Sequence, residues 1–258
     1  MVNFDYQTPT RLIFGKGVVA EKLQGVMAKF GKKVLLTYGG GSIKRSGLYD
    51  QVKEILKDKE IFELGGIEPN PKYNPSVLEG VKICKENDIE VVLAVGGGSV
   101  IDSAKAIANG VGYDGDVWDV YTGKHTPKTF VPLGCVLTIP AAGSEMSDSS
   151  VITNEDGDVK KGYSNNLCRA KFAIMDPERT FTLPAWQTAC GITDMIMHTM
   201  ERYFTNGGNM ELTDQLAEGL LRTVKMNALI LAKDPGNYDA RAEVMWAGSL
   251  AHNGLTGC

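Results

Sequence analysis

Long hydrophobic runs are missing from this sequence. The longest apolar stretch, residues 130–142, is broken by Pro132 and Pro140, and it is too short to cross a bilayer. Residues 1–5 lack the basic and apolar regions of a secretion signal. The sequence therefore predicts a cytoplasmic protein that does not use a membrane as its partner.

Positive charge, histidine and cysteine are scarce as well. The 258 residues contain 27 Lys and Arg against 31 Asp and Glu, a net charge of −4, which argues against a nucleic-acid partner. Three histidines are available for metal binding or proton transfer. The five cysteines lack metal-binding spacing and are interpreted as reduced thiols; they are Cys84, Cys135, Cys168, Cys190 and Cys258.

The first 182 residues alternate short apolar runs with amphipathic segments. This pattern predicts an α/β fold, with a mainly parallel sheet covered by helices on both faces. The expected strands are residues 11–14, 33–38, 61–64, 91–95, 136–139 and 172–175, and the clearest helices are 47–57, 75–87 and 100–109. We expect a Rossmann-like, dinucleotide-binding domain over residues 1–182.

The pattern changes at Pro184, a residue that suits the first turn of a helix. No strand is expected beyond it. Leu212, Leu216, Leu220 and Val224 recur at every fourth position, which predicts one apolar helical face. Residues 183–258 are therefore expected to begin an all-helical domain.

Three glycines and a serine follow the expected buried strand at 91–95, where the next helix begins. Bare glycines at a helix N-terminus leave backbone N–H groups open, and the helix dipole adds partial positive charge there. The turn at residues 96–99 therefore favours a phosphate or pyrophosphate. Gly-rich turns of this kind also occur for close packing alone, so both interpretations stay open.

A second turn of the same composition, residues 39–42, follows the strand at 33–38. Two such turns in one sheet favour a dinucleotide, although neither matches G-x-G-x-x-G with a later acidic residue. Gly39 and Gly40 occupy the place where NAD enzymes often carry a carboxylate, and Lys44 or Arg45 would attract a 2′-phosphate. NADP is therefore favoured over NAD, unless both cations are simply solvated.

Polar residues also follow the expected strand at 136–139. The segment 138–145 lies at the carboxyl end of a parallel strand, where ligands of α/β proteins bind. Its hydroxyls suit a ribose or a phosphate, and an ordinary capped turn explains them equally well.

One acidic residue and one histidine are spaced for metal binding in the helical part. Asp194 and His198 stand four residues apart on one helix face, so a carboxylate oxygen and an imidazole nitrogen can reach one divalent cation. A surface hydrogen bond between them is the alternative. His252 is expected to be a satisfied, partly buried histidine and not a ligand.

Taken in order, these segments resemble the iron-dependent (group III) alcohol dehydrogenases, most closely their butanol dehydrogenase branch. The match covers essentially the whole chain, and the ordered series is far more specific than any one motif. The matching segments are Asn3-Phe4, Pro9-Thr10, residues 14–17, 39–42, 66–71, 96–102, Trp118-Asp119, 138–146, Asp176-Pro177, Thr193-Asp194, His198 and Glu201.

The resemblance implies a two-domain enzyme that moves a hydride between NADP, or NAD, and a short-chain primary alcohol or aldehyde such as butanol or butyraldehyde. It implies a divalent metal, Fe²⁺ or Zn²⁺, in the helical domain, and a homodimer. By motif position, the metal ligands would be Asp194 and His198, and the nucleotide-binding residues would be Gly39, Gly40, Ser42, Asn70, Gly97, Gly98, Ser99, Asp102, Thr138, Ser147 and Lys160. Gly97 to Ser99 would hold the pyrophosphate, Asp102 would lie beside the ribose, and Thr138, Ser147 and Lys160 would contact the nicotinamide half.

The sequence departs from the family at its metal site. The family uses one aspartate and three histidines, and two of those histidines come later than Cys258. We therefore expect a C-terminally truncated form with weak metal affinity. The alternatives are a silent dinucleotide-binding fragment and a relative of glycerol dehydrogenase or dehydroquinate synthase.

Overall fold

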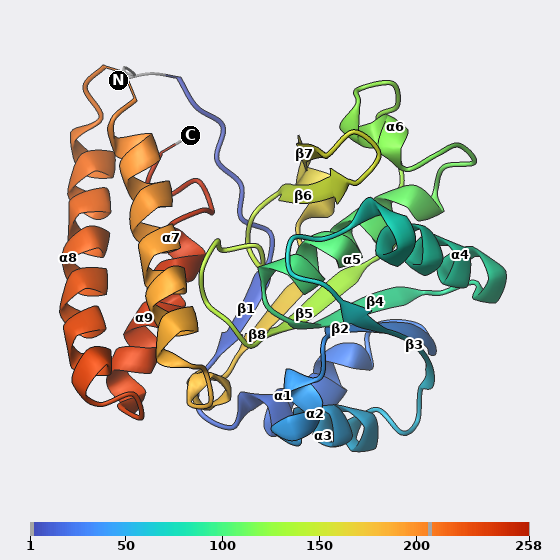
Figure 1. The fold of residues 1–258 in the computed structure, drawn as a ribbon, viewed down its shortest axis with the longest axis horizontal. Helices are drawn as coiled ribbons and strands as arrows, with labels where there is room; N and C mark the ends of the chain where they lie inside the picture. The colour runs from blue at the N-terminus through green and yellow to red at the C-terminus, as the bar shows by residue number, and fades with distance from the viewer. Residues whose placement is uncertain (1–2, 206–207, 258) are drawn as a thin grey trace.

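A six-stranded parallel sheet forms the centre of the larger lobe (Figure 1). The computed structural model describes residues 3–205 and 208–257. The sheet order is β1-β8-β5-β4-β2-β3, and every neighbouring pair is parallel. Its strands are β1 (Arg11–Phe14), β2 (Lys33–Gly39), β3 (Glu60–Ile67), β4 (Val91–Gly96), β5 (Leu133–Leu137) and β8 (Phe172–Met175). The predicted α/β class is confirmed.

Helices cover both faces of this sheet (Figure 1). One face carries α1 (Val18–Met27), α2 (Ser42–Arg45) and α3 (Leu48–Ile55), and the other carries α4 (Leu78–Asn87), which follows a π-helical turn at Tyr73–Val77, and α5 (Gly98–Val111). Side chains alternate along a strand, so Leu35 faces one core and Val34 and Leu36 face the other. The short helix α6 (Trp118–Tyr121) lies beyond α5, and 3-10 turns follow at Asn166–Cys168 and Pro177–Thr180.

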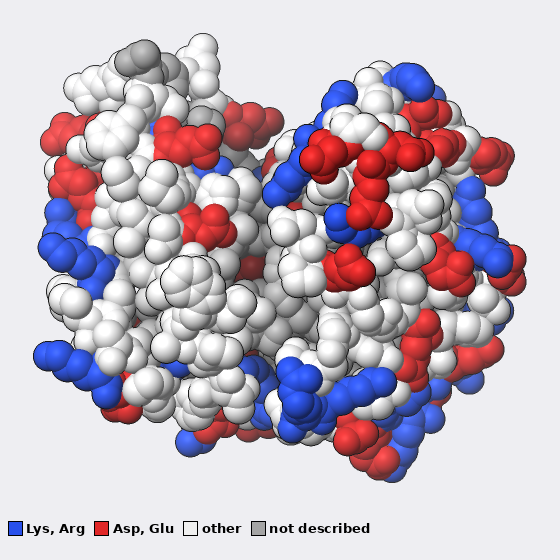
Figure 2. Space-filling model, viewed as in Figure 1, with Lys and Arg blue, Asp and Glu red and all other residues white. Residues whose placement is uncertain are grey.

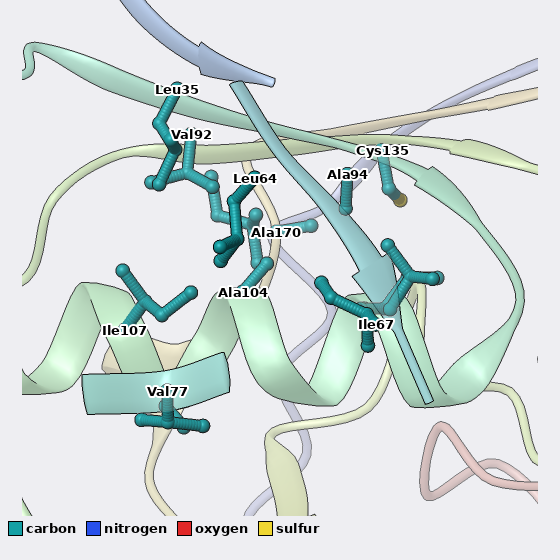
Figure 3. Packing of buried hydrophobic residues seen from close by; sticks show 14 of the residues in the cluster. Leu35, Leu64, Ile67, Val77, Val92, Ala94, Ala104, Ile107, Cys135 and Ala170 are labelled. Atoms are coloured by element: carbon teal, nitrogen blue, oxygen red, sulfur yellow. The ribbon is translucent and has the colours of Figure 1, made fainter. Parts of the chain in front are cut away.

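Helix α5 passes directly beneath the sheet. Figure 3 shows Ala104 and Ile107 of this helix pointing toward Leu35 and Val92 of the strands, and all four side chains are fully buried. Small residues on α5 allow this close approach. The helix is thereby fixed with its N-terminus at the carboxyl edge of the sheet.

The smaller lobe is formed by three long helices, α7 (Ala185–Tyr203), α8 (Glu211–Lys233) and α9 (Tyr238–Leu250). The predicted apolar face of α8 is buried only in part: Leu220 and Val224 are 8% and 0% exposed, and Leu212 is 70% exposed. The 23 residues of α8 outrun the 13 residues of α9, by roughly 15 Å at the helical rise. Within the part of the chain that the structure describes, the beginning of α8 therefore leaves an apolar surface open. The boundary between residues 182 and 183 stays a prediction.

Two local features differ from the sequence-based expectation. Strand β5 begins and ends earlier than residues 136–139, so Thr138 follows the strand, with its N–H bonded to the carbonyl of Gly96 at 3.0 Å. A two-stranded antiparallel hairpin, β6 (Ser149–Asn154) with β7 (Val159–Ser164), was not predicted. Among the described helices, none has the length and apolarity needed to cross a membrane.

Four described cysteines are free thiols, and Cys258 lies outside the described residues. Cys84, Cys135 and Cys168 are buried and Cys190 is exposed. Burial raises the pKa of Cys84 to about 12.

Alkylation of the native protein is expected to separate these thiols. Because the thiolate is the reactive form and must reach the reagent, exposed Cys190 is expected to react at least about 100-fold faster than Cys84 near pH 8. Peptide mass mapping over a time course of iodoacetamide labelling measures both rates. Equal rates in folded protein would contradict the burial described here, and labelling in denaturant is the control that removes the difference.

Candidate active site

The N-terminus of α5 forms the centre of the candidate site. No side chain caps this helix end at Gly97, and the N–H groups of Val100 and Ile101 bond back to the carbonyl of Gly97 at 3.1 and 3.2 Å. A Cβ on Gly98 would lie 3.3 Å from the Ser144 hydroxyl. The first turn of the helix therefore presents its backbone to a small space beside Ser144, which suits an anion.

Packing also explains part of the glycine requirement. A Cβ on Gly96 would come within 2.6 Å of the Val100 side chain, and one on Gly97 within 3.1 Å of Ile139. Close packing therefore explains Gly96 and Gly97, whereas Gly98 lies at the open end of the helix.

The second glycine turn lies beside the first. Strands β2 and β4 are neighbours in the sheet, and a Cβ on Gly39 would lie 3.7 Å from the side chain of Val100 in α5. Gly40 faces open space, since no atom lies within 4 Å of its would-be Cβ. The two turns thus share one edge of the sheet, with room above the second for part of a dinucleotide, and exposed Ser42 begins α2 there.

The unpredicted hairpin brings Lys160 and Asn70 together. The Lys160 ammonium donates to Asn70 Oδ1 at 3.4 Å across 90 residues of sequence, and Lys72 pairs with Glu155 at 2.8 Å. Asn70 and Lys160 are both exposed. Asp156-Gly157, with Gly157 at φ 85, is the sequence signal that identifies this hairpin.

Ser147 is placed differently from the expectation for a nicotinamide contact. It is 2% exposed, and its hydroxyl accepts a hydrogen bond from Lys105 at 3.1 Å. Thr138, 9% exposed, likewise shows little surface. Their contact with a nucleotide stays a prediction.

Helix α5 carries a half-buried carboxylate, Asp102, which the sequence predicted as a site residue, and a fully buried Lys105, which it did not. Asp102 accepts a hydrogen bond from the N–H of Val151 at 2.9 Å with one oxygen, and its other oxygen, Oδ1, is buried without a hydrogen-bond partner among the described residues. Lys105, one turn later, is 0% exposed. Burial raises the pKa of Asp102 and lowers the pKa of Lys105, and each charge opposes the shift of the other. Apart from Asp102 and Lys105, α5 consists of small, apolar or uncharged residues. A lysine in such a helix is the sequence signal that could have identified Lys105.

The candidate metal ligands face each other on α7. Asp194 Oδ1 lies 3.5 Å from His198 Nε2, and the His198 ring stacks on His252 with centroids 4.5 Å apart. His252 Nδ1 donates to the carbonyl of Ala142 at 2.8 Å, and burial lowers the pKa of His252 to about 4. His252 is therefore the satisfied, partly buried histidine that the sequence predicts.

These side chains form an incomplete donor set. One carboxylate and one imidazole are the right chemistry for iron or zinc, but a tetrahedral site needs four donors. Within residues 3–205 and 208–257, no cluster of three or more His, Cys, Asp or Glu side chains is arranged to hold a metal ion. The described chain alone therefore does not fit a resident metal, whereas the α5 terminus and the orphaned Asp102 oxygen fit a nucleotide.

Segment 138–148, which connects β5 to β6, contacts the smaller lobe. The Ser249 hydroxyl of α9 donates to Glu145 at 2.5 Å, and His252 holds Ala142. Figure 2 shows the surface hollowed between the lobes. The candidate nucleotide and metal residues therefore flank one interlobe segment.

Gly191 of α7 is fitted tightly against this segment. A Cβ there would lie 2.4 Å from the backbone oxygen of Pro140. Because backbone must move to admit it, Gly191→Ala is expected to lower the free energy of unfolding by about 1–3 kcal/mol. The matched change Gly219→Ala in α8 meets nothing within 4 Å and is expected to raise it by up to about 1 kcal/mol. Urea denaturation of both variants measures the difference, and equal effects would contradict the close contact.

The chain matches the models of one known protein family. The family model for iron-containing alcohol dehydrogenase matches residues 9–177, and the model for the C-terminal part of the Fe-containing alcohol dehydrogenase family matches residues 188–257. The chain is 51% identical over 257 residues to a probable NADH-dependent butanol dehydrogenase of Bacillus subtilis, covering 99% of this chain and 66% of that protein. It is 42% identical to the NADPH-dependent aldehyde reductase YqhD of Escherichia coli, covering 100% and 66%.

A solved structure shows the same fold. The NADH-dependent butanol dehydrogenase A of Thermotoga maritima superimposes with a TM-score of 0.94 at 42% identity, over 98% of this chain and 64% of that one. The chain thus spans slightly less than two thirds of the length of these relatives. The family matches and the shared fold establish that this chain belongs to the iron-containing alcohol dehydrogenase family.

Proposed function

We propose that this chain supplies the nucleotide site, and two of the metal ligands, of an NAD(P)H-dependent alcohol dehydrogenase or aldehyde reductase. The substrate class is a short-chain primary alcohol or aldehyde such as butanol or butyraldehyde. The names of the B. subtilis and E. coli relatives, a butanol dehydrogenase and an aldehyde reductase, support this class.

The observation that carries the proposal is the uncapped N-terminus of α5 beside the orphaned oxygen of Asp102. Backbone N–H groups and the helix dipole would stabilise a pyrophosphate there, and a carboxylate oxygen would accept from a ribose hydroxyl. Gly97, Gly98 and Ser99 would hold the phosphates, and Gly39, Gly40 and Ser42 would border the adenosine half. Asn70 and Lys160 would close over the nucleotide from the hairpin.

The bound nicotinamide would supply or accept the hydride, and the metal would polarise the carbonyl oxygen. Asp194 and His198 are proposed as two metal ligands, with further donors needed to complete the shell. The chain's own contribution is to hold the nucleotide at the edge of the sheet, across the interlobe segment from those ligands.

For the nucleotide, we propose a preference for NADPH over NADH. Gly39 and Gly40 place no carboxylate against a 2′-phosphate, and the Lys44 ammonium lies close by, 5.0 Å and 4.8 Å above the rings of Tyr38 and Tyr49. The names of several relatives instead specify NADH. The ratio of the two dissociation constants for this chain decides between them, and a lower constant for NADH would reject the preference.

A second candidate function is nucleotide binding without turnover. The two-donor metal set of the described chain favours it. We further propose a cytoplasmic location and, as the resemblance implies, a homodimer for the active protein.

One experiment separates the two candidates. The 258-residue chain is titrated with NADPH by fluorescence, assayed for bound iron and zinc, and tested for NADPH oxidation with butyraldehyde. Nucleotide binding with metal and turnover supports the dehydrogenase, and nucleotide binding without either supports the silent form. Absence of any nucleotide binding contradicts both. Oxidation of glycerol in preference to butanol would instead favour the glycerol dehydrogenase relatives.

A further inference from the structure

The ammonium of Lys105 is a fully buried charge that the proposed function leaves unused. Lys105 is among the largest fully buried side chains of the described protein. Its Nζ donates to the carbonyl of Ser147 at 2.9 Å, the hydroxyl of Ser147 at 3.1 Å and the carbonyl of Ser149 at 2.7 Å. Three acceptors match the three hydrogens of an ammonium, whereas a neutral amine has two. The geometry therefore favours a charged lysine here.

A buried charge of this kind is costly unless an opposite charge offsets it. The Asp102 carboxylate lies one turn earlier on the same helix, three residues before Lys105. Each of these charges opposes the pKa shift that burial causes in the other. Asp102 uses Oδ2 for the Val151 N–H, and Oδ1 has no donor within hydrogen-bond distance among the described residues. The Ser144 hydroxyl lies close enough to lower the pKa of the carboxyl. Lys105 uses its three hydrogens on Ser147 and Ser149, so it does not occupy Asp102 Oδ1.

We propose that Lys105 is a positioning residue for nucleotide binding: it anchors the 147–149 corner and supplies a counter-charge to Asp102 beside the N-terminus of α5. This inference rests on the proposed nucleotide site. An ionised Asp102 can only accept, which suits a hydroxyl donor on a ribose. A neutral Asp102 would lose the charge-assisted part of that hydrogen bond.

Other groups also act on the pair and enter the expected pH dependence. Facing Asp102 are Lys105 of its own helix, the Val151 N–H of β6, Ser144 of the interlobe segment, Lys160 of β7 and Tyr121 of α6. Facing Lys105 are Asp102, Cys135 of β5, Cys168 and Glu145. Lys160 is exposed, and burial raises the pKa of Cys135, of Cys168 and of Glu145. Lys105 is consequently the buried cation that lowers the pKa of Asp102.

Lys105→Gln separates charge from anchoring, because an amide still donates to the two carbonyls but carries no charge. Loss of the charge-assisted bond is expected to weaken NADPH binding about 10- to 100-fold at the pH values where Asp102 is protonated. The direction of the pH dependence follows from the raised pKa of Asp102. Without Lys105, the pKa of Asp102 rises further, so binding is lost at a higher pH than in the unaltered chain and recovers as the pH is raised. Lys105→Arg retains the charge and is expected to restore the unaltered pH profile.

The test is a fluorescence titration of the 258-residue chain with NADPH from about pH 6 to pH 9, with thermal unfolding as the check on folding. Asp102→Asn is expected to bind weakly at every pH, and Asp102→Asn with Lys105→Gln is expected to bind no worse than Asp102→Asn alone. Arg169→Met is the matched control. It removes the other buried cation on this corner, which bonds Met146 O at 2.5 Å and pairs with Asp148, and the pH profile is expected to stay unchanged.

Three results would overturn the inference. They are an unshifted pH profile in Lys105→Gln, additive losses in the double variant, and the same profile change in Arg169→Met. If Lys105→Gln does not fold, the other two variants still test the inference. NADPH binding by Lys105→Arg that does not depend on pH, or normal NADPH binding by Asp102→Asn, would contradict the positioning role of Lys105. Failure of the unaltered chain to bind NADPH at any pH would instead reject the proposed function, and the inference with it.

Discussion

Gly98→Leu is expected to raise the dissociation constant for NADPH at least about 100-fold, which corresponds to the loss of one or two charge-assisted hydrogen bonds. The leucine side chain would begin 3.3 Å from the Ser144 hydroxyl and extend over the first turn of α5. It would occupy the place where a pyrophosphate meets the backbone N–H groups. Isothermal titration of the variant and the unaltered chain measures the change.

The control for this substitution is Gly25→Leu in α1. Gly25 is an exposed helical glycine with nothing within 4 Å of its would-be Cβ, so the same residue is added far from the carboxyl edge of the sheet. Its nucleotide affinity is expected to match that of the unaltered chain. A folded Gly98→Leu variant that also binds normally would show that the nucleotide lies elsewhere.

Asp194→Ala is expected to abolish tight metal binding and to reduce aldehyde reduction at least about 100-fold, because losing a ligand exceeds the effect of losing a supporting contact. The measurement needs a longer protein that combines this chain with the remaining third of its relatives' length, since the described residues hold two donors. Metal content by mass spectrometry and NADPH oxidation are the two readouts. Nucleotide affinity is expected to stay within about twofold, because Asp194 lies on α7 and the proposed nucleotide site on α5.

Glu201→Ala is the matched control on the same helix. Glu201 Oε2 lies 3.9 Å from His198 Nδ1, and the Glu201 side chain is 77% exposed. Removing the Glu201 carboxylate is therefore expected to leave metal content and turnover nearly unchanged. Normal metal content in Asp194→Ala would contradict the proposed ligand role. Equal losses in both variants would point to general disruption of α7.

The sheet and its glycine turns were predictable because local pattern and tertiary structure agree there. The fully apolar run at 91–95 is buried on both faces in the structure, as parallel strands require. The turns at 39–42 and 96–99 lie side by side because β2 and β4 are neighbours. Sequence order does not determine which strands are neighbours in the sheet. Only the fold shows that the two glycine turns share one edge.

Other features depend on contacts between distant residues. The β6–β7 hairpin is mostly exposed on β7, so it lacks the apolar alternation that predicts a strand. Lys105 acquires its role from carbonyls more than 40 residues later. The stripe on α8 predicts a helix correctly, but periodicity does not reveal that Leu212 lies beyond the cover of α9.

The most direct test of the account is a crystal structure of the 258-residue chain with NADPH. The account predicts pyrophosphate oxygens within hydrogen-bond distance of the backbone N–H groups of Gly98 and Ser99, with a ribose hydroxyl donating to Asp102 Oδ1. A nucleotide bound away from the N-terminus of α5, or none at saturating concentration, would contradict it.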